Sequence, residues 1–317
     1  MSMMYRIFSL RWLSTMLFSL VLNCAVIAEP AQREAVQARL LTVKVAAVQC
    51  SSELGAVEAN RAKLIALVEA AAAQGAKIIV LPEACITGYL SQDLRWNWHV
   101  PGRPLAPVFA GQDPRPFAET VPGPSTRLFC EAAKRLRVYV TVPFLEVEQS
   151  ENGARRYFNT VCLAAPDGRL VAHYRKLTPW PHPEQSWATS GDRGVQTFDT
   201  EYGRVGLAIC YDIHTILEKY APHKIWALLY PIAWVDESHP AEWFWHQLPR
   251  RLRPFGHYII GANWSVDEPQ KWFGYGFSEM LSPTGEIVAS SRKLYGSDII
   301  YATIPTAYAQ SRFVNAD

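Results

Sequence analysis

Short apolar runs of strand type alternate with segments of helical spacing along most of this chain. Residues 42–48 and 78–81 are apolar runs of strand length. Between them, the apolar positions of residues 56–74 recur at helical spacing and are followed by Gly75, a residue typical of helix C-termini. Such alternation is typical of α/β proteins. We therefore expect an α/β fold.

The same alternation continues after a long segment over residues 82–124. This segment is rich in Pro, Gly and Trp without a regular period, and we interpret it as a functional loop. Ser125 is expected to cap a helix that ends near residue 137. Further strands are expected at 138–146, 157–165, 170–174, 195–198, 205–209, 225–230 and 258–262. An aromatic helix from about residue 241 must be kinked or interrupted by Pro249 and Pro254, and a terminal hairpin is expected around residues 283–285.

The first 28 residues differ in character from the rest of the chain. Arg6 and Arg11 precede an apolar stretch over 12–22, and small residues at 26–28 offer a cleavage site, a pattern typical of export signals. The stretch is well short of the roughly 20 apolar residues that cross a bilayer. We therefore predict a signal peptide over 1–28, a connector over 29–41, a single domain over 42–317, and a periplasmic or extracellular location.

The cysteines leave two questions open. Cys24 lies in a segment that loosely resembles a lipobox, so a lipid anchor is an alternative to a soluble exported form. Cleavage after residue 28 would leave five cysteines, namely Cys50, Cys85, Cys130, Cys162 and Cys210. An odd number implies at least one free thiol or a bond between chains.

The charge balance and the spacing of His and Cys residues indicate which binding partners to expect. The 31 basic and 29 acidic residues are spread along the chain and leave a formal net charge of +2. This balance gives no sign of a nucleic-acid or anionic-membrane surface, so we expect a small-molecule partner. No His or Cys pair has metal-ligand spacing with a matching second pair, and neither a metal nor another cofactor is predicted.

Three reactive side chains each follow a predicted strand. Glu83, Lys176 and Cys210 come just after the runs that end at residues 81, 174 and 209. Because ligands bind at the carboxyl ends of strands in α/β sheets, the three side chains could share one pocket. Taken singly, the Cys could be a buried apolar residue, the Glu a cap and the Lys a solvated charge.

Together the three residues predict amide chemistry. Cys210 would attack a carbonyl as a thiolate whose pKa is lowered by the nearby ammonium and by backbone N–H groups. Glu83 would act as general base and Lys176 would stabilise the oxyanion. A Cys–His hydrolase using His214, four residues after Cys210, is the nearest mechanistic alternative.

The segments around these residues resemble the carbon-nitrogen hydrolase (nitrilase) superfamily. Val80-Leu81-Pro82-Glu83 with Thr87-Gly88-Tyr89, Tyr174-Arg175-Lys176-Leu177, and the run from Gly203 to Asp212 match its base, lysine and nucleophile segments in order. The resemblance covers about residues 42–304. It implies a four-layer α-β-β-α sandwich, usually a homodimer formed through the helices near the nucleophile.

The resemblance also implies supporting roles. Glu184 resembles the family's further conserved carboxylate, which orients the lysine. Tyr211 would support the nucleophile, and Tyr89 and Trp234 would line the substrate pocket. Cys210-Tyr211-Asp212 is similar to the amide-cleaving branches, and some segments are similar to the exported vanin and biotinidase branch, whose long cysteine-rich C-terminal extension this chain lacks.

We therefore expect an exported hydrolase that cleaves a linear, non-peptide amide through a cysteine thioester. The alternatives are a nitrilase or N-carbamoyl hydrolase of the same superfamily, an amidase-like transferase with an amine as acceptor, and an inactive homologue that binds a ligand.

Overall fold

The computed structural model describes residues 41–88, 114–181, 184–234, 243–267 and 276–309. The chain divides into two compact units, Met1–Leu41 and Thr42–Asp317. The predicted signal peptide, Cys24 and nearly all of the predicted connector lie outside the described residues. Every element named below belongs to the second unit.

The first of two six-stranded sheets has the strand order β12-β1-β2-β3-β4-β5. β2 lies parallel to β1 and β3, whereas β12, β4 and β5 each pair with their neighbours in antiparallel register. The strands are β1 (Thr42–Gln49), β2 (Ile78–Val80), β3 (Tyr139–Gln149), β4 (Arg155–Ala164), β5 (Leu170–Arg175) and β12 (Asp298–Pro305). β2, β3 and β5 therefore run in the same direction.

The second six-stranded sheet has the order β11-β10-β9-β8-β7-β6. Its three central strands, β7, β8 and β9, are parallel, and antiparallel strands flank them on both sides. The strands are β6 (Thr197–Thr200), β7 (Gly203–Leu207), β8 (Ala227–Ile232), β9 (Tyr258–Asn263), β10 (Glu279–Leu281) and β11 (Ile287–Ser290).

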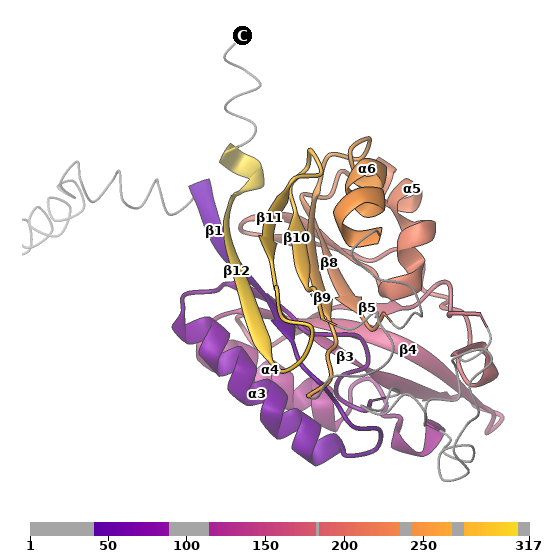
Figure 1. Ribbon diagram of the computed structural model, residues 1–317. Helices are drawn as coiled ribbons and strands as arrows, with labels where there is room; N and C mark the ends of the chain where they lie inside the picture. Colours follow the sequence, from indigo (N-terminus) through magenta and orange to yellow (C-terminus); the bar gives the residue numbers. More distant parts are fainter. Residues whose placement is uncertain (1–40, 89–113, 182–183, 235–242, 268–275, 310–317) are drawn as a thin grey trace, which may run out of the picture. The chain divides into compact units, whose positions relative to one another are not determined.

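Side-chain alternation along the strands produces four layers. Val45 and Ala47 of β1 lie in one buried core with Leu229 of the second sheet, whereas Ala46 and Val48 belong to another core. This second core holds the buried faces of α3 (Val57–Ala73) and α4 (Pro124–Leu136). On the far side of the second sheet lie α5 (Ile216–Tyr220) and α6 (Leu248–Leu252), as Figure 1 shows. The expected α-β-β-α sandwich is confirmed.

One helix terminus differs from the sequence expectation, and one predicted helix is interrupted near its prolines. Gly123, not Ser125, is the N-cap of α4, because Pro124 fits the first helical position without a backbone N–H. The Ser125 hydroxyl instead donates to Glu119 Oε1 at 2.7 Å. The aromatic helix is interrupted as expected: Pro249 lies in the first turn of α6, where the π-helical turn η6 (Trp243–Gln247) changes to α-helix, and α6 ends two residues before Pro254. The missing N–H of Pro costs little in a first turn.

The end of the chain extends beyond the expected hairpin. β10 and β11 form that hairpin, with Gly285 N donating to Ser282 O at 2.9 Å in the turn. The chain then crosses to the first sheet, where β12 pairs with the whole of β1. Since the residues of β12 pair with residues about 250 positions or more away in sequence, local patterns could not predict this pairing.

A buried carboxyl group lies on the second sheet. Glu279 of β10 is opposite Gly261 of β9, on the face that also carries Tyr230. The Glu279 residue is 3% exposed, and neither carboxylate oxygen has a hydrogen-bond partner within the described part of the chain. Burial raises the pKa of Glu279 to about 8. A substantial fraction of Glu279 is therefore neutral near pH 7.

The thiols of Cys50, Cys85, Cys130, Cys162 and Cys210 are all unpaired. Within the described ranges, no three His, Cys, Asp or Glu side chains gather as a metal-ion site. No helix in those ranges has the length and apolar character needed to cross a membrane.

Candidate active site

The three predicted catalytic residues leave two different sheets at one edge. Glu83 follows β2 and Lys176 follows β5 in the first sheet, while Cys210 follows β7 in the second. A hydrogen bond connects the sheets at this edge, because Glu83 N donates to Ile232 O at the end of β8 over 3.3 Å. The site is therefore built across the sandwich.

Lys176 lies between two carboxylates. Its Nζ is 2.7 Å from Glu83 Oε1 and 2.6 Å from Glu184 Oε2, and all three side chains are fully buried. Removing one partner from such a buried group leaves an uncompensated charge, typically at a cost of about 3–5 kcal/mol. The structure thus brings Glu184 to the lysine, as the family resemblance implies.

Asn159 joins the two carboxylates and was not foreseen from the sequence. Its Nδ2 donates to Glu83 Oε1 at 2.7 Å and to Glu184 Oε1 at 2.6 Å. The Trp180 backbone N–H also donates to Glu184 Oε2 at 2.7 Å. The available signal was a single amide residue in the buried part of β4, where a polar group needs a partner.

These contacts set the protonation of the site. Burial by itself would lower the pKa of Lys176, but the charges of Glu184 and Glu83 outweigh it and raise that pKa, so the lysine stays an ammonium. Burial raises the pKa of Glu83, and the charge of Glu184 adds to the rise while Lys176 opposes it. Glu83 Oε2 is buried and accepts no hydrogen bond within the described residues, which leaves this oxygen available for a proton.

Cys210 occupies a strained turn at the start of η4 (Cys210–His214). Its φ of 39° lies in the left-handed region that few non-glycine residues adopt. Asp212 holds the turn: its carboxylate accepts from Ile209 N at 3.2 Å, Thr178 N at 2.8 Å and the Tyr174 hydroxyl at 2.7 Å. The backbone therefore presents the thiol in a fixed position.

The thiol of Cys210 is protonated at rest, contrary to the expectation of a lowered pKa. Burial raises its pKa far above the ordinary value, and the negative charge of Glu83 adds to the rise. The ammonium of Lys176 and the Ala233 backbone hydrogen bond act in the opposite direction but are weaker. Nucleophilic attack by Cys210 thus requires a base that removes the proton.

A comparison with protein-family models shows the family to which this chain belongs. Residues 44–312 match the model of the carbon-nitrogen hydrolase family. This protein belongs to the carbon-nitrogen hydrolase family. Human omega-amidase NIT2 is 30% identical over 247 residues, which covers 73% of this chain and 78% of the human protein. The zebrafish (Danio rerio) omega-amidase NIT2 is 29% identical over 262 residues, covering 78% and 83%.

Solved structures share the fold of this hydrolase. Nit3 of Saccharomyces cerevisiae, a member of the nitrilase superfamily, superposes with a TM-score of 0.64 at 24% identity and covers 87% of this chain and 94% of its own. An amidase from Nesterenkonia sp. superposes with a TM-score of 0.63 at 16% identity and covers 86% and 94%. The four-layer architecture is thus that of known nitrilase-type proteins.

Tyr211, which was predicted to support the nucleophile, contacts the ring of a neighbouring histidine. The Tyr211 ring packs edge-on against His214 at a centroid distance of 4.8 Å, and burial lowers the pKa of that histidine.

The predicted pocket residues have only partial support. Trp234 follows β8 closely, its backbone N–H donates to Asn263 Oδ1 at 3.0 Å, and its ring meets that of Phe244 at 5.5 Å. Tyr89 lies outside the described residues. The supporting role of Tyr211 and the pocket roles of Tyr89 and Trp234 stay predictions.

Proposed function

We propose that this carbon-nitrogen hydrolase cleaves linear amides, with Cys210 as nucleophile, Glu83 as general base and Lys176 as the cation that stabilises the oxyanion. The observation that carries the proposal is the asymmetric binding of Glu83. Lys176 and Asn159 hold one carboxylate oxygen, while the buried second oxygen has no partner in the described chain. A carboxylate fixed in this way is suited to proton transfer.

The reaction begins with proton transfer from the Cys210 thiol to Glu83 as sulfur attacks the amide carbonyl carbon. The carbonyl π electrons move to oxygen, and the resulting negative charge is stabilised by Lys176 and by backbone N–H groups beside the nucleophile. Glu83 then gives its proton to the leaving nitrogen, and the C–N bond breaks to leave a thioester. Water, deprotonated by Glu83, hydrolyses the thioester, and the thiol regains its proton.

Relatives favour amides over the other substrate classes. The human and zebrafish proteins at 29–30% identity are omega-amidases. Nesterenkonia amidase has been solved with butyramide, and with the acetamide moiety of fluoroacetamide attached covalently to its active-site cysteine. These relatives make primary amides the first substrates to test, ahead of nitriles, N-carbamoyl compounds and vitamin amides such as pantetheine and biotin derivatives.

The test is an assay of that panel with wild type and Cys210→Ala in parallel. We expect ammonia release from butyramide or from monoamides of dicarboxylic acids by wild type, and loss of at least about 1000-fold in Cys210→Ala. Intact-mass analysis after rapid acid quench should show an acyl adduct on wild type only. Ammonia formed equally by both proteins, or activity with none of the amides, would refute the proposal.

We also propose that the chain is exported, with cleavage near residue 28, and that it forms a homodimer through the helices near the nucleophile. The sequence pattern of the first 28 residues motivates the first claim and the family resemblance the second. Cell fractionation with N-terminal mass analysis tests export, and a lipid mass on Cys24 would reveal the anchored alternative. Light scattering on the purified protein tests the dimer.

A further inference from the structure

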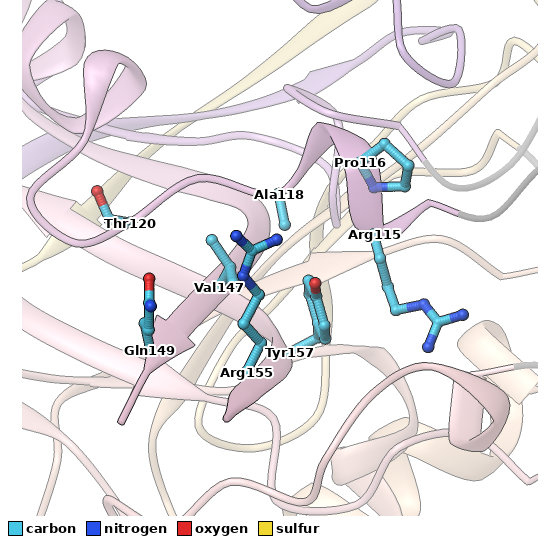
Figure 2. Close-up of a pocket in the computed structure, with 8 residues that line it drawn as sticks. All are labelled: Arg115, Pro116, Ala118, Thr120, Val147, Gln149, Arg155 and Tyr157. Atoms are coloured by element: carbon cyan, nitrogen blue, oxygen red, sulfur yellow. The ribbon is translucent and has the colours of Figure 1, made fainter. Parts of the chain in front are cut away.

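Packed core separates Cys210 from the groove at the ends of β3 and β4. That groove is lined by residues of these strands and of the segment around η2 (Arg115–Phe117), and none of them is one of the proposed catalytic residues (Figure 2). Ala84, Leu145 and Ala233 lie between the groove and the nucleophile and are at most 4% exposed. On this side, the position of Cys210 is therefore set by packed neighbours.

The end of β8 contacts the nucleophile through a side chain. In the parallel pairing of β7 with β8, Leu207 is opposite Leu229, and Ala208 N donates to Leu229 O at 3.3 Å. Beyond this point the hydroxyl of Tyr230 donates to the backbone carbonyl of Cys210 at 2.8 Å. The Tyr230 side chain thus extends the connection between the two strands to the nucleophile itself.

A second contact from the same segment reaches the sulfur. The backbone of Ala233 hydrogen-bonds to the Cys210 thiol and acts to lower its pKa. The next residue is fixed in turn, because Trp234 N donates to Oδ1 of the buried Asn263 at 3.0 Å. The end of β8 therefore holds the nucleophile at two points, its carbonyl and its sulfur.

Tyr230 is a fixed hydrogen-bond donor beside a strained residue. Its side chain is fully buried, and burial raises the pKa of the phenol, with the charges of Cys210 and Glu83 adding to the rise, so the hydroxyl keeps its proton. Cys210 needs support from outside its own turn, because its φ of 39° is unfavourable for a residue with a side chain. Asp212 supports the preceding residue through Ile209 N, whereas Tyr230 binds the carbonyl of Cys210 itself.

We propose that Tyr230 is a positioning residue, which keeps Cys210 in its strained turn with the sulfur in place for attack. The inference rests on the proposed amidase function and adds a residue to it. The same hydrogen bond polarises the peptide group between Cys210 and Tyr211, which makes the Tyr211 N–H beside the nucleophile a stronger donor. Without the hydroxyl this peptide group is free to rotate, and the sulfur and the N–H move together.

The experiment compares wild type with Tyr230→Phe, which keeps the ring and removes only the hydroxyl. Because small displacements of a reacting atom are costly, kcat for the best amide should fall about 10- to 100-fold while KM changes less than about threefold. Iodoacetamide labelling of Cys210, measured relative to Cys130 in the same sample by peptide mass spectrometry, should slow about tenfold, because the displaced thiol loses its Ala233 hydrogen bond.

Tyr220→Phe is the matched control. Tyr220 is as deeply buried, and its hydroxyl donates to Leu207 O at 2.6 Å, on the strand that leads to the nucleophile. Both variants should lose thermal stability, but only Tyr230→Phe should change kcat and the labelling ratio. A ring-fluorinated tyrosine incorporated at position 230 keeps the hydroxyl as a stronger donor and should label at least as fast as wild type.

Three outcomes would overturn the proposal. The first is an equal fall in kcat for the two phenylalanine variants, and the second is a change below about threefold in both kcat and the labelling ratio of Tyr230→Phe. The third is slow labelling of the fluorinated variant, which remains decisive if Tyr230→Phe does not fold. If wild type hydrolyses no amide, the proposed function fails, whereas the labelling comparison still decides the role of Tyr230.

Discussion

Replacing Glu279 by Gln should change how the stability of the protein depends on pH. The folded protein raises the pKa of this carboxyl from 4.5 to about 8 because the side chain is buried. The unfolded chain therefore loses the proton first, and between these two values the folded state is disfavoured by about 1.4 kcal/mol for each pH unit. The full effect above pH 8 is roughly 5 kcal/mol, and it is absent below about pH 4.5.

Glutamine cannot ionise, so the free energy of unfolding of the variant does not fall over this pH range through residue 279. Between pH 5.5 and 8.5 the unfolding free energy of Glu279→Gln should rise relative to wild type by about 3 kcal/mol. For a domain of this size the change corresponds to roughly 6–12 °C in Tm. The amide introduced by Glu279→Gln could itself change the free energy of unfolding. That change would be the same at both pH values and would not affect this comparison.

The assay is equilibrium urea unfolding of both proteins at several pH values, or Tm at a constant scan rate if unfolding is irreversible. Glu286→Gln is the matched control, because Glu286 is an exposed carboxyl on the same hairpin. Parallel pH profiles for wild type and Glu279→Gln would refute the reasoning and imply that Glu279 is solvated or paired in solution.

Three further predictions concern the active site. Because burial raises the pKa of Glu83 and the base form is required, kcat/KM should fall with decreasing pH at a point above 4.5; an acid limb at or below 4.5 in the pH profile would contradict this assignment. Asn159→Leu removes two hydrogen bonds to carboxylates, each worth about 1.5–3 kcal/mol, so kcat/KM should fall at least about 100-fold while circular dichroism stays native. Iodoacetamide should label Cys210 faster than Cys130, which among the thiols of the described residues is the other one not fully buried, and Glu83→Gln should remove the difference, as read by peptide mass spectrometry. Equal labelling in the wild type would favour an inactive ligand-binding protein.

The residue patterns predicted the individual strands, and the family resemblance implied the four layers, but neither predicted how the first sheet is completed by β12. Apolar alternation located most strands to within about two residues, because each strand of the sandwich has to bury at least one face. The pairing of β12 with β1 was missed because it joins the two ends of the second unit and has no local signal. The N-cap of α4 was misplaced by two residues because Ser125 and Gly123 are both acceptable caps, and Pro124 decides between them.

At the site, the sequence indicated which residues meet but not their protonation. Lys176 does contact both Glu83 and Glu184. A nearby ammonium by itself predicts a lowered pKa for Cys210, but burial raises this pKa and is the larger effect. Asn159 was missed because a single amide within a strand gives no indication of which distant groups it will bind.

The pairing of β12 with β1 has a consequence for synthesis of the protein. One edge of β1 has no partner until residues 298–305 have left the ribosome, and an unpaired strand edge is a template for association with other chains. The nascent chain thus passes through nearly its whole translation with an aggregation-prone edge exposed. A stop codon just before residue 298 should therefore yield insoluble protein instead of a slightly shorter enzyme.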